Sequence, residues 1–469
     1  MTTPAGFPLA PSRAPSGSRT WAFLLAVLAL SACVLPAGAA ARIDEAARAR
    51  AHEVLARARA EARTVTGSAR ACALSPAAKV AAIPGFAAEA GTTGGLGGPT
   101  LTVTSDADYG RGSPPIVGSL RAVVAEAARR RGPTTIVFDP ALTGRTISLQ
   151  AAIRPPDDTT LDGGCTGVTL IAPAEIPLIM LPGRRNVVVA GLTLRKYPYE
   201  GENKGRSDGR DFRDCITVTG AFDRLAVIHN DFETCGDGEI DITSGVGRPM
   251  PPAGIGRITI AYNRFGRHDK AMLFGTDGCG GAPAAGGGCP NYADPAARPL
   301  EPLYRMTLAG NFFEWAGQRQ PRAFGRVLLH EVENLFAFEP YDRGDGSAGA
   351  TYATFASDGA LVLAESNLFL GVPAAGRLPM GLSTTTTPGA SVPRNESEAA
   401  IRAEGNLAVA DEVVDQNRPH LVPAVCYGGA RPIAPLDLRA LGARTAMACI
   451  IARAGPAGAA DWPAGACRR

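Results

Sequence analysis

The chain lacks several features that would assign it to common functional classes. Its 47 lysines and arginines nearly balance 44 acidic residues, and a net charge of +3 is too small to favour nucleic acid or an anionic membrane as a partner. No CxxC pair occurs and no histidine lies close to a cysteine, so a zinc site is not predicted. The apolar run at 21–30 is too short to span a bilayer. What remains is a globular chain of 469 residues, long enough for one large domain or two ordinary ones.

The N-terminus has the pattern of an export signal. Arg13 and Arg19 precede the apolar run with no acidic residue among them. "LSAC" (30–33) resembles a bacterial lipobox with Cys33 as the lipidated residue, whereas "AGAAA" (37–41) offers sites for an ordinary signal peptidase. Residues 1–41 are therefore predicted to export a bacterial protein, which is either secreted or held as an outer-surface or periplasmic lipoprotein. A lipid anchor at Cys33 would be its contact with a membrane.

Export would allow the ten cysteines to form disulfides. Cys279 and Cys289 flank the Gly/Ala-rich loop "CGGAPAAGGGC" and are predicted to pair. Cys449 and Cys467, near the C-terminus, form a second candidate pair. If Cys33 is lipidated, nine cysteines remain, so at least one is free or pairs with another molecule.

Plentiful glycine (56) and proline (38) predict many turns and little long helix. Two helices are still expected, one over the Ala/Arg/Glu-rich residues 42–66 and an amphipathic one over 118–132. From about residue 134, short β-branched strands recur between Gly, Asn, Asp or Pro, with no long helix to make a βαβ series. The predicted organisation is an export signal (1–41), a helical spacer or cap (42–84), a strand-rich domain (85–375) and C-terminal coils with a capping segment (376–469).

A recurring Asn-x-Phe tripeptide closes many of these strands. Its asparagines are spaced 33, 48, 23, 33 and 39 residues apart, and the shortest spacing fits one turn of a three-stranded coil. A β-sandwich is the alternative, but it would show more hairpin dipeptides and two-residue connections. We therefore predict an all-β fold, a right-handed parallel β-helix with an N-terminal helix cap and a loop-rich C-terminal segment. The repeats are Asn230/Phe232, Asn263/Phe265, Asn311/Phe313, Asn334/Phe336 and Asn367/Phe369, continued by Asn406.

Acidic residues gather near two of these strands. Asp214 precedes "CITV". In "DGEIDI" the acids Asp237, Glu239 and Asp241 occupy alternate positions, which places their three side chains on one face of a strand. Like charges in a row repel one another unless a cation lies among them. Ligands that are all oxygen suit Ca²⁺ or Mg²⁺ rather than zinc. The acids thus indicate a hard-cation site, with a solvated polar strand face as the alternative.

Three basic residues follow on later strands. Lys270 lies in "HDKAMLFG" (268–275), and Arg319 and Arg322 flank Pro321 in "QRQPRAFG". Taken singly, each would be assigned to the surface, because lysine and arginine are rarely buried. Successive coils of a β-helix stack about 4.8 Å apart, so residues distant in sequence can line one cleft. Three carboxylates, one lysine and two arginines are therefore candidates for a single site.

The order and spacing of these motifs resemble polysaccharide lyase family one, the pectate lyases. The resemblance runs over roughly residues 85–370 and includes "GTTGG" (91–95), "RDCITV", "DGEIDI", "RHDKAMLFG", "RQPR" and "AESNLF". It implies that the calcium ligands are Asp214, Asp237 and Asp241, that Lys270 binds substrate and that Arg319 is catalytic.

One position departs from the pattern of the family. Many members carry a second substrate arginine five residues after the catalytic one, where this chain has Phe324. Arg322 or Arg326 could compensate for it, and Arg322 is taken as the second substrate-binding residue. If neither compensates, affinity for substrate would fall.

The resemblance implies cleavage of polygalacturonate, an acidic plant cell-wall polysaccharide, by β-elimination. Ca²⁺ and Lys270 would stabilise charge beside the C6 carboxylate while Arg319 takes the C5 proton. An arginine acts as a base only in its neutral form, so an alkaline optimum is expected.

Other functions remain open. A pectin lyase, acting on methyl-esterified polymer without calcium, is the nearest alternative, although the intact acid set argues for a charged substrate. A polygalacturonase is disfavoured because its Gly-His-Gly and Arg-Ile-Lys segments are absent. A non-catalytic exported polysaccharide-binding β-helix is the alternative from another class. In each case a monomer is expected.

Overall fold

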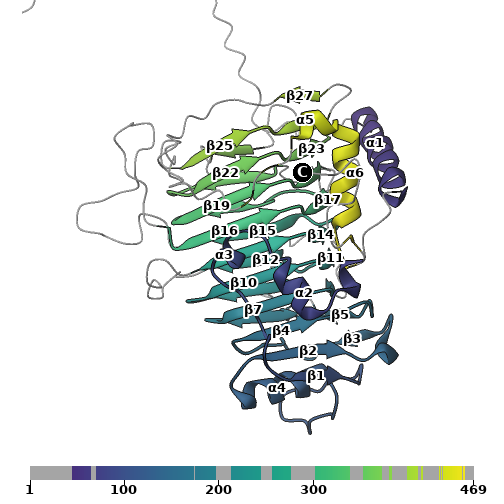
Figure 1. Ribbon diagram of the computed structural model, residues 1–469, viewed down its shortest axis with the longest axis vertical. Helices are drawn as coiled ribbons and strands as arrows, with labels where there is room; N and C mark the ends of the chain where they lie inside the picture. The colour runs from purple at the N-terminus through teal and green to yellow at the C-terminus, as the bar shows by residue number, and fades with distance from the viewer. Residues whose placement is uncertain are drawn as a thin grey trace, which may run out of the picture. The chain divides into compact units, whose positions relative to one another are not determined.

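Three long β-sheets form the body of the protein, and consecutive strands pass from one sheet to the next (Figure 1). The computed structural model describes residues 45–64, 70–173, 175–196, 213–243, 256–275, 302–338, 352–371, 380–382, 399–409, 413–415, 433, 435, 437–456 and 458–459. These residues belong to one compact unit, 40–469. The predicted export signal with Cys33 lies outside them. No helix in the described ranges combines the length and apolarity needed to cross a bilayer.

The first sheet has ten strands, which run parallel throughout. Its order is β1 (Thr100–Val103), β2 (Thr134–Phe138), β4 (Thr159–Asp162), β7 (Arg185–Ala190), β10 (Asp223–Ile228), β13 (Arg257–Ala261), β16 (Tyr304–Ala309), β19 (Val327–Val332), β22 (Leu361–Glu365) and β25 (Ala400–Glu404).

The second sheet is parallel except at one edge, where β27 pairs antiparallel with β26. Its strands are β3 (Thr146–Ser148), β5 (Thr169–Ala172), β8 (Thr193–Lys196), β11 (Asp231–Thr234), β14 (Arg264–Phe265), β17 (Phe312–Ala316), β20 (Leu335–Phe338), β23 (Leu368–Leu370), β26 (Leu407–Val409) and β27 (Val413–Asp415).

The third sheet completes each coil and carries the candidate site. Its parallel strands are β6 (Ile179–Pro182), β9 (Ile216–Thr219), β12 (Gly238–Thr243), β15 (Lys270–Gly275), β18 (Arg322–Phe324), β21 (Thr354–Ser357) and β24 (Met380–Leu382). With three parallel sheets visited in turn, the architecture is the right-handed parallel β-helix predicted from the sequence.

The Asn-x-Phe repeat builds two internal stacks. Each asparagine side chain donates through Nδ2 to Oδ1 of the asparagine one coil on, from Asn230 to Asn406, over distances of 2.9–3.1 Å. The phenylalanines stack in parallel, with ring centroids 4.8 Å apart from Phe232 through Phe336 and 5.2 Å at Phe369. Both stacks are buried, so one tripeptide per coil fixes a turn and fills the interior, as predicted.

Helices cover the sides and one end of the strand body. α4 (Leu120–Arg130) starts at Ser119, whose hydroxyl accepts from Ala122 N at 3.3 Å, and packs its apolar face into the core beside β1 and β2. α4 thus lies at the end of the strand body, whereas the helical spacer or cap was predicted over residues 42–84. The helix expected at 42–66 forms as α1 (Glu45–Thr64), which packs with α6 (Ala443–Arg453) against the second sheet (Figure 1).

Shorter helical turns complete the N- and C-terminal segments. They are η1 (Ala71–Ala73), α2 (Pro76–Ala81), α3 (Gly85–Glu89), η2 (Pro140–Leu142) and α5 (Leu438–Leu441). α3 lies against the first sheet, where its Phe86 and Ala87 N–H groups donate to hydroxyls of Thr307 and Thr259. α2 is anchored by buried Lys79, whose Nζ lies 2.5 Å from Asp162 Oδ1.

The two disulfides that the structure describes are pairs that the sequence did not single out. Cys72 joins Cys165, and Cys215 joins Cys235 on the next coil. Cys449 is also disulfide-bonded. Cys279, Cys289 and Cys467 lie outside the described residues, so the pairs that involve them stay predictions.

Glu331 of β19 is a buried acid, and it predicts a pH effect on stability. Its Oε2 accepts from Thr354 Oγ1 at 2.5 Å, and burial raises its pKa to about 8. Between its ordinary pKa of 4.5 and about 8, the folded state holds a proton that the unfolded state has released, so stability falls as pH rises through this window. Glu331→Gln should therefore melt close to wild type at pH 5 and several degrees higher at pH 9. Parallel melting curves at both pH values would contradict this, and exposed Glu89→Gln is the control.

Candidate metal and substrate site

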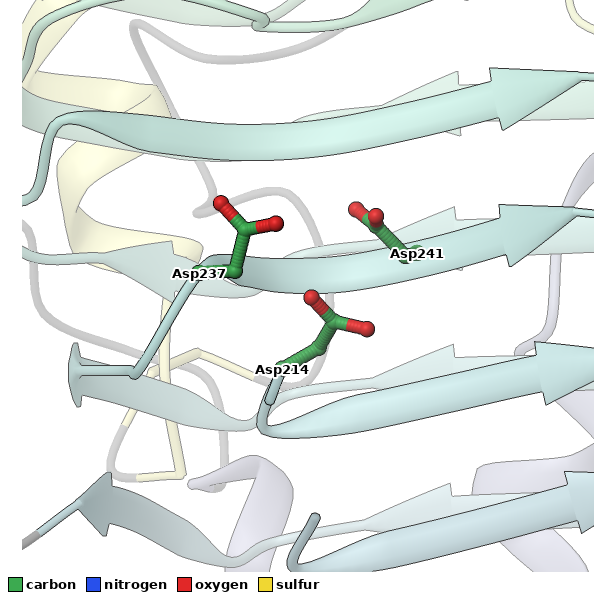
Figure 2. Close-up of side chains that lie close together, drawn as sticks. All are labelled: Asp214, Asp237 and Asp241. Carbon is green, nitrogen blue, oxygen red and sulfur yellow. The ribbon is translucent and has the colours of Figure 1, made fainter. Parts of the chain in front are cut away.

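Three aspartates converge on the outer face of the third sheet (Figure 2). Asp214 stands just before β9 and Asp237 just before β12, where turns from the second sheet end, while Asp241 lies within β12. One carboxylate oxygen from each lies within 4.8 Å of the others. The Cys215–Cys235 disulfide ties together the two turns that deliver Asp214 and Asp237. The structure therefore brings together the three acids that the sequence singled out.

Backbone and hydroxyl groups hold two of these carboxylates. Asp214 accepts from Gly238 N at 3.0 Å and from Thr217 Oγ1 at 2.8 Å. Asp241 accepts from Leu273 N at 3.2 Å. A Cβ at Gly238 would lie 2.6 Å from Asp241 Oδ1 and 3.3 Å from Asp214 Oδ1, so glycine is needed for these two carboxylates to approach each other.

The surroundings of Asp214 and Asp241 disfavour the ionised forms of their carboxylates. Burial is the main cause that raises the pKa of Asp214 to about 6, and the charge of Asp237 adds to it. Burial, followed by the charges of Asp214 and Asp237, also holds the pKa of Asp241 well above its usual range. A divalent cation would reverse this balance, because it favours the ionised carboxylates. An all-oxygen donor set with room between its members fits Ca²⁺ or Mg²⁺.

Glu239 does not join the cluster, which corrects the alternation expected from "DGEIDI". Its side chain is fully buried, and within the described part of the chain neither carboxylate oxygen has a hydrogen-bond partner. Burial, and then the charge of Asp231, raises its pKa well above the usual range. Glu239 has no paired residue in β9 or β15, although Gly238 and Ile240 beside it keep one register with β15. Simple strand alternation therefore fails at this position.

The cationic residues lie on the next two coils. Lys270 opens β15, and its Nζ donates to Asp237 Oδ1 at 2.8 Å. Arg319 stands in the turn before β18, where its carbonyl accepts from Met272 N at 2.6 Å and its charge opposes the raised pKa of Asp241. Arg322 opens β18. It is paired with Leu273 of β15, which is in turn paired with Asp241 of β12, so the three residues lie in one row across the sheet. All six residues predicted for the site thus lie on one sheet and its entering turns.

An apolar surface borders the charged part of this sheet. Phe324 lies across Gly275 of the neighbouring strand, so closely that a Cβ on Gly275 would be 2.0 Å from ring carbons. Leu273 and Phe355 flank Arg322 in the strand register, and all are half-buried. Sequence reasoning noted Phe324 but missed the two flanking residues, because only the strand register places them there.

Groups behind the site stabilise its turns. His268 is fully buried, its Nε2 lies 2.7 Å from the Asp237 carbonyl oxygen, and burial lowers its pKa. Asp269 accepts from Gln318 Nε2 at 3.0 Å, and so joins the turn of Lys270 to the turn of Arg319. Both residues therefore hold the backbone that presents the cationic side chains.

The fold and these residues define a class: a parallel β-helix with a cluster of three aspartates beside cationic side chains on one outer face. The chain is similar to Pectate lyase 1 of Hesperocyparis arizonica, with 30% identity over 293 residues. The match covers 59% of this chain and 65% of that relative, slightly less than two thirds of its length. The resemblance to pectate lyases predicted from the sequence is thus confirmed, while no family model matches the chain.

Solved structures are similar to this chain over most of its length. Jun a 1, the major allergen from cedar pollen, is 20% identical with a TM-score of 0.49, covering 80% of this chain and 92% of that one. A pectate lyase from Bacillus sp. N165 in complex with trigalacturonate is 17% identical with a TM-score of 0.48, covering 79% and 98% of the two chains.

Proposed function

We propose that the protein is a calcium-dependent pectate lyase of polysaccharide lyase family one, which cleaves α-1,4-polygalacturonate by β-elimination to 4,5-unsaturated oligogalacturonates. The observation that carries this proposal is the convergence of Asp214, Asp237 and Asp241 beside Lys270 and Arg319 on one sheet. The similarity to Pectate lyase 1 supports it.

The site residues have two kinds of role in this proposal: some bind Ca²⁺ or substrate, and one transfers a proton. Asp214, Asp237 and Asp241 would hold Ca²⁺, which when bound neutralises the substrate carboxylate and stabilises charge that develops beside it. Lys270, now bonded to Asp237, is placed to bind the same uronate carboxylate, and Arg322 to bind a neighbouring one. These contacts would fix the sugar ring with its C5–H toward Arg319.

The elimination itself needs one base and one leaving group. Neutral Arg319 takes the proton from C5, the C5–H electron pair forms the C4–C5 double bond, and the C4–O4 bond breaks. The leaving O4 takes a proton from water. Because guanidinium gives up its proton only at high pH, activity should rise on the alkaline side, and nearby Lys270 and a bound cation would assist by disfavouring the charged form.

The apolar surface favours a second candidate substrate. Leu273, Phe324 and Phe355 present no positive charge that could pair with a carboxylate. A methyl-esterified uronate, which is neutral, would suit this surface better than a charged one. Partly esterified pectin is therefore the alternative substrate, and a pectin lyase the alternative enzyme.

The proposed setting is outside the cytoplasm. Residues 1–41 would direct export, with Cys33 lipidated or removed, and the exported protein would act as a monomer on an acidic plant cell-wall polysaccharide. Residues 42–84, 85–375 and 376–469 would then be the N-terminal spacer, the catalytic β-helix and the C-terminal capping segment.

The unsaturated product gives a direct test. The mature protein is incubated with polygalacturonate or with highly esterified pectin, each with Ca²⁺ or with a chelator, and the ultraviolet absorbance of the 4,5-unsaturated uronate is followed. Calcium-dependent absorbance on polygalacturonate is expected. Absorbance on esterified pectin that is unaffected by the chelator would favour a pectin lyase. No absorbance on either polymer, with polygalacturonate still retained in a pull-down, would leave a binding protein and reject the enzyme.

A further inference from the structure

Tyr352 lies beside the turn that carries Arg319, although sequence reasoning gave it no role. The two segments are joined by backbone hydrogen bonds, since Tyr352 N donates to Gly317 O at 3.2 Å and Gln320 N donates to Ala353 O at 2.7 Å. The buried Gln320 side chain adds a third link, donating to Tyr352 O at 3.4 Å. The position of Tyr352 relative to Arg319 is therefore fixed by the backbone.

The opposite side of the same turn is held by β15. Ala271 N donates to Gln318 O at 3.0 Å, and Met272 N donates to Arg319 O at 2.6 Å. The turn is thus clamped between the coil of Lys270 and the coil of Tyr352. What remains to be oriented is the guanidinium of Arg319, since the backbone alone does not determine where a long flexible side chain ends.

The Tyr352 side chain is placed to supply that orientation. Its half-buried ring packs against Phe355, with centroids 5.0 Å apart, and its phenol lies close enough to Arg319 to interact with the guanidinium. The charged groups that face it are Arg319, Arg322 and Asp269. Burial is the largest influence and raises the pKa of Tyr352, so the phenol stays neutral at alkaline pH.

We propose that Tyr352 is a positioning residue, which accepts a hydrogen bond from Arg319 and directs the guanidinium toward substrate without contributing a negative charge. This inference rests on the proposed function, in which Arg319 acts as a base. A carboxylate in the same place would orient the guanidinium equally well, but it would stabilise the charged form and so oppose the release of a proton. Asp241 also interacts with Arg319, but the bound cation would occupy that carboxylate.

The test compares two substitutions at this position. Tyr352→Phe keeps the ring but removes the acceptor, and should lower kcat about 10- to 100-fold while KM for polygalacturonate and the melting temperature stay near wild type. Tyr352→Glu adds a negative charge beside Arg319, which stabilises the protonated guanidinium. The rise of kcat with pH should therefore move to higher pH by about one pH unit or more. Tyr109→Phe is the matched control, because Tyr109 also contacts an arginine, Arg121, but lies outside the site.

The outcomes separate the two proposals. Tyr352→Phe with wild-type kcat and an unshifted profile, measured against an active wild type, would overturn the role of Tyr352 and leave the proposed function intact. A parallel fall in melting temperature and kcat, with no profile shift in Tyr352→Glu, would also overturn it, because that pattern describes a packing role. A wild type that forms no unsaturated product would overturn both.

Discussion

Arg319→Lys should lower kcat on polygalacturonate by about a thousandfold or more, because it removes the group that takes the C5 proton. Arg319 has φ of 58°, and its carbonyl is fixed by Met272 N, so lysine can replace it without changing the turn. The shorter ammonium group would not reach the same point and would lose the interaction with the Tyr352 phenol. Initial rates of unsaturated product, measured at saturating substrate, give kcat directly.

Arg322→Lys is the matched comparison on the same segment. Arg322 opens β18, three residues after Arg319, and is proposed to bind a carboxylate rather than to move a proton. Its substitution should raise KM several-fold and leave kcat within about threefold of wild type, since a lysine keeps the charge but not the bidentate contact. If Arg319→Lys instead kept full kcat while Arg322→Lys lost it, the two roles would have to be exchanged.

Sequence reasoning succeeded where one residue type performs the same task in every coil. The Asn230–Asn406 ladder and the Phe232–Phe369 stack need identical side chains at identical positions, so their spacing alone indicates the coil. Asp214, Asp237, Asp241, Lys270 and Arg319 could be grouped for a related reason. Four of them stand at or just before the start of a strand of the third sheet and Asp241 lies within one, and stacked strands bring such positions together.

The residues that escaped prediction depend on contacts between turns of different length. Tyr352 reaches Arg319 because its segment is bonded to Gly317 and Gln320, and nothing in the sequence near Tyr352 indicates that pairing. Glu239 is the opposite case, because regular alternation would place on the outer face a side chain that is fully buried. Cys72 and Cys165 likewise join because α2 and its neighbouring turns fold back on the first sheet.

The acid cluster leads to the second large effect, in which Asp241→Asn should shift the response to calcium to much higher concentrations. Removing one of three carboxylates should weaken Ca²⁺ binding by about 100-fold or more, because a ligand charge is lost along with a ligand atom. Without calcium, the variant should melt at a higher temperature than wild type, since Asp214, Asp237 and Asp241 repel one another in a site where burial already disfavours charge. With calcium, the order should reverse.

This crossover distinguishes a metal site from a merely polar surface. The melting temperatures of wild type and Asp241→Asn, measured across a calcium titration, would show the crossover. Calorimetric titration with Ca²⁺ would give the two affinities. Asp223→Asn serves as the control, because Asp223 is held by Arg257 on the first sheet and should leave the calcium response unchanged. Equal calcium-induced stabilisation of wild type and Asp241→Asn would remove Asp241 from the ligand set. A solvated acidic surface would give a third pattern, with no calcium response in either protein and a small effect of the substitution, because exposed like charges interact weakly through water.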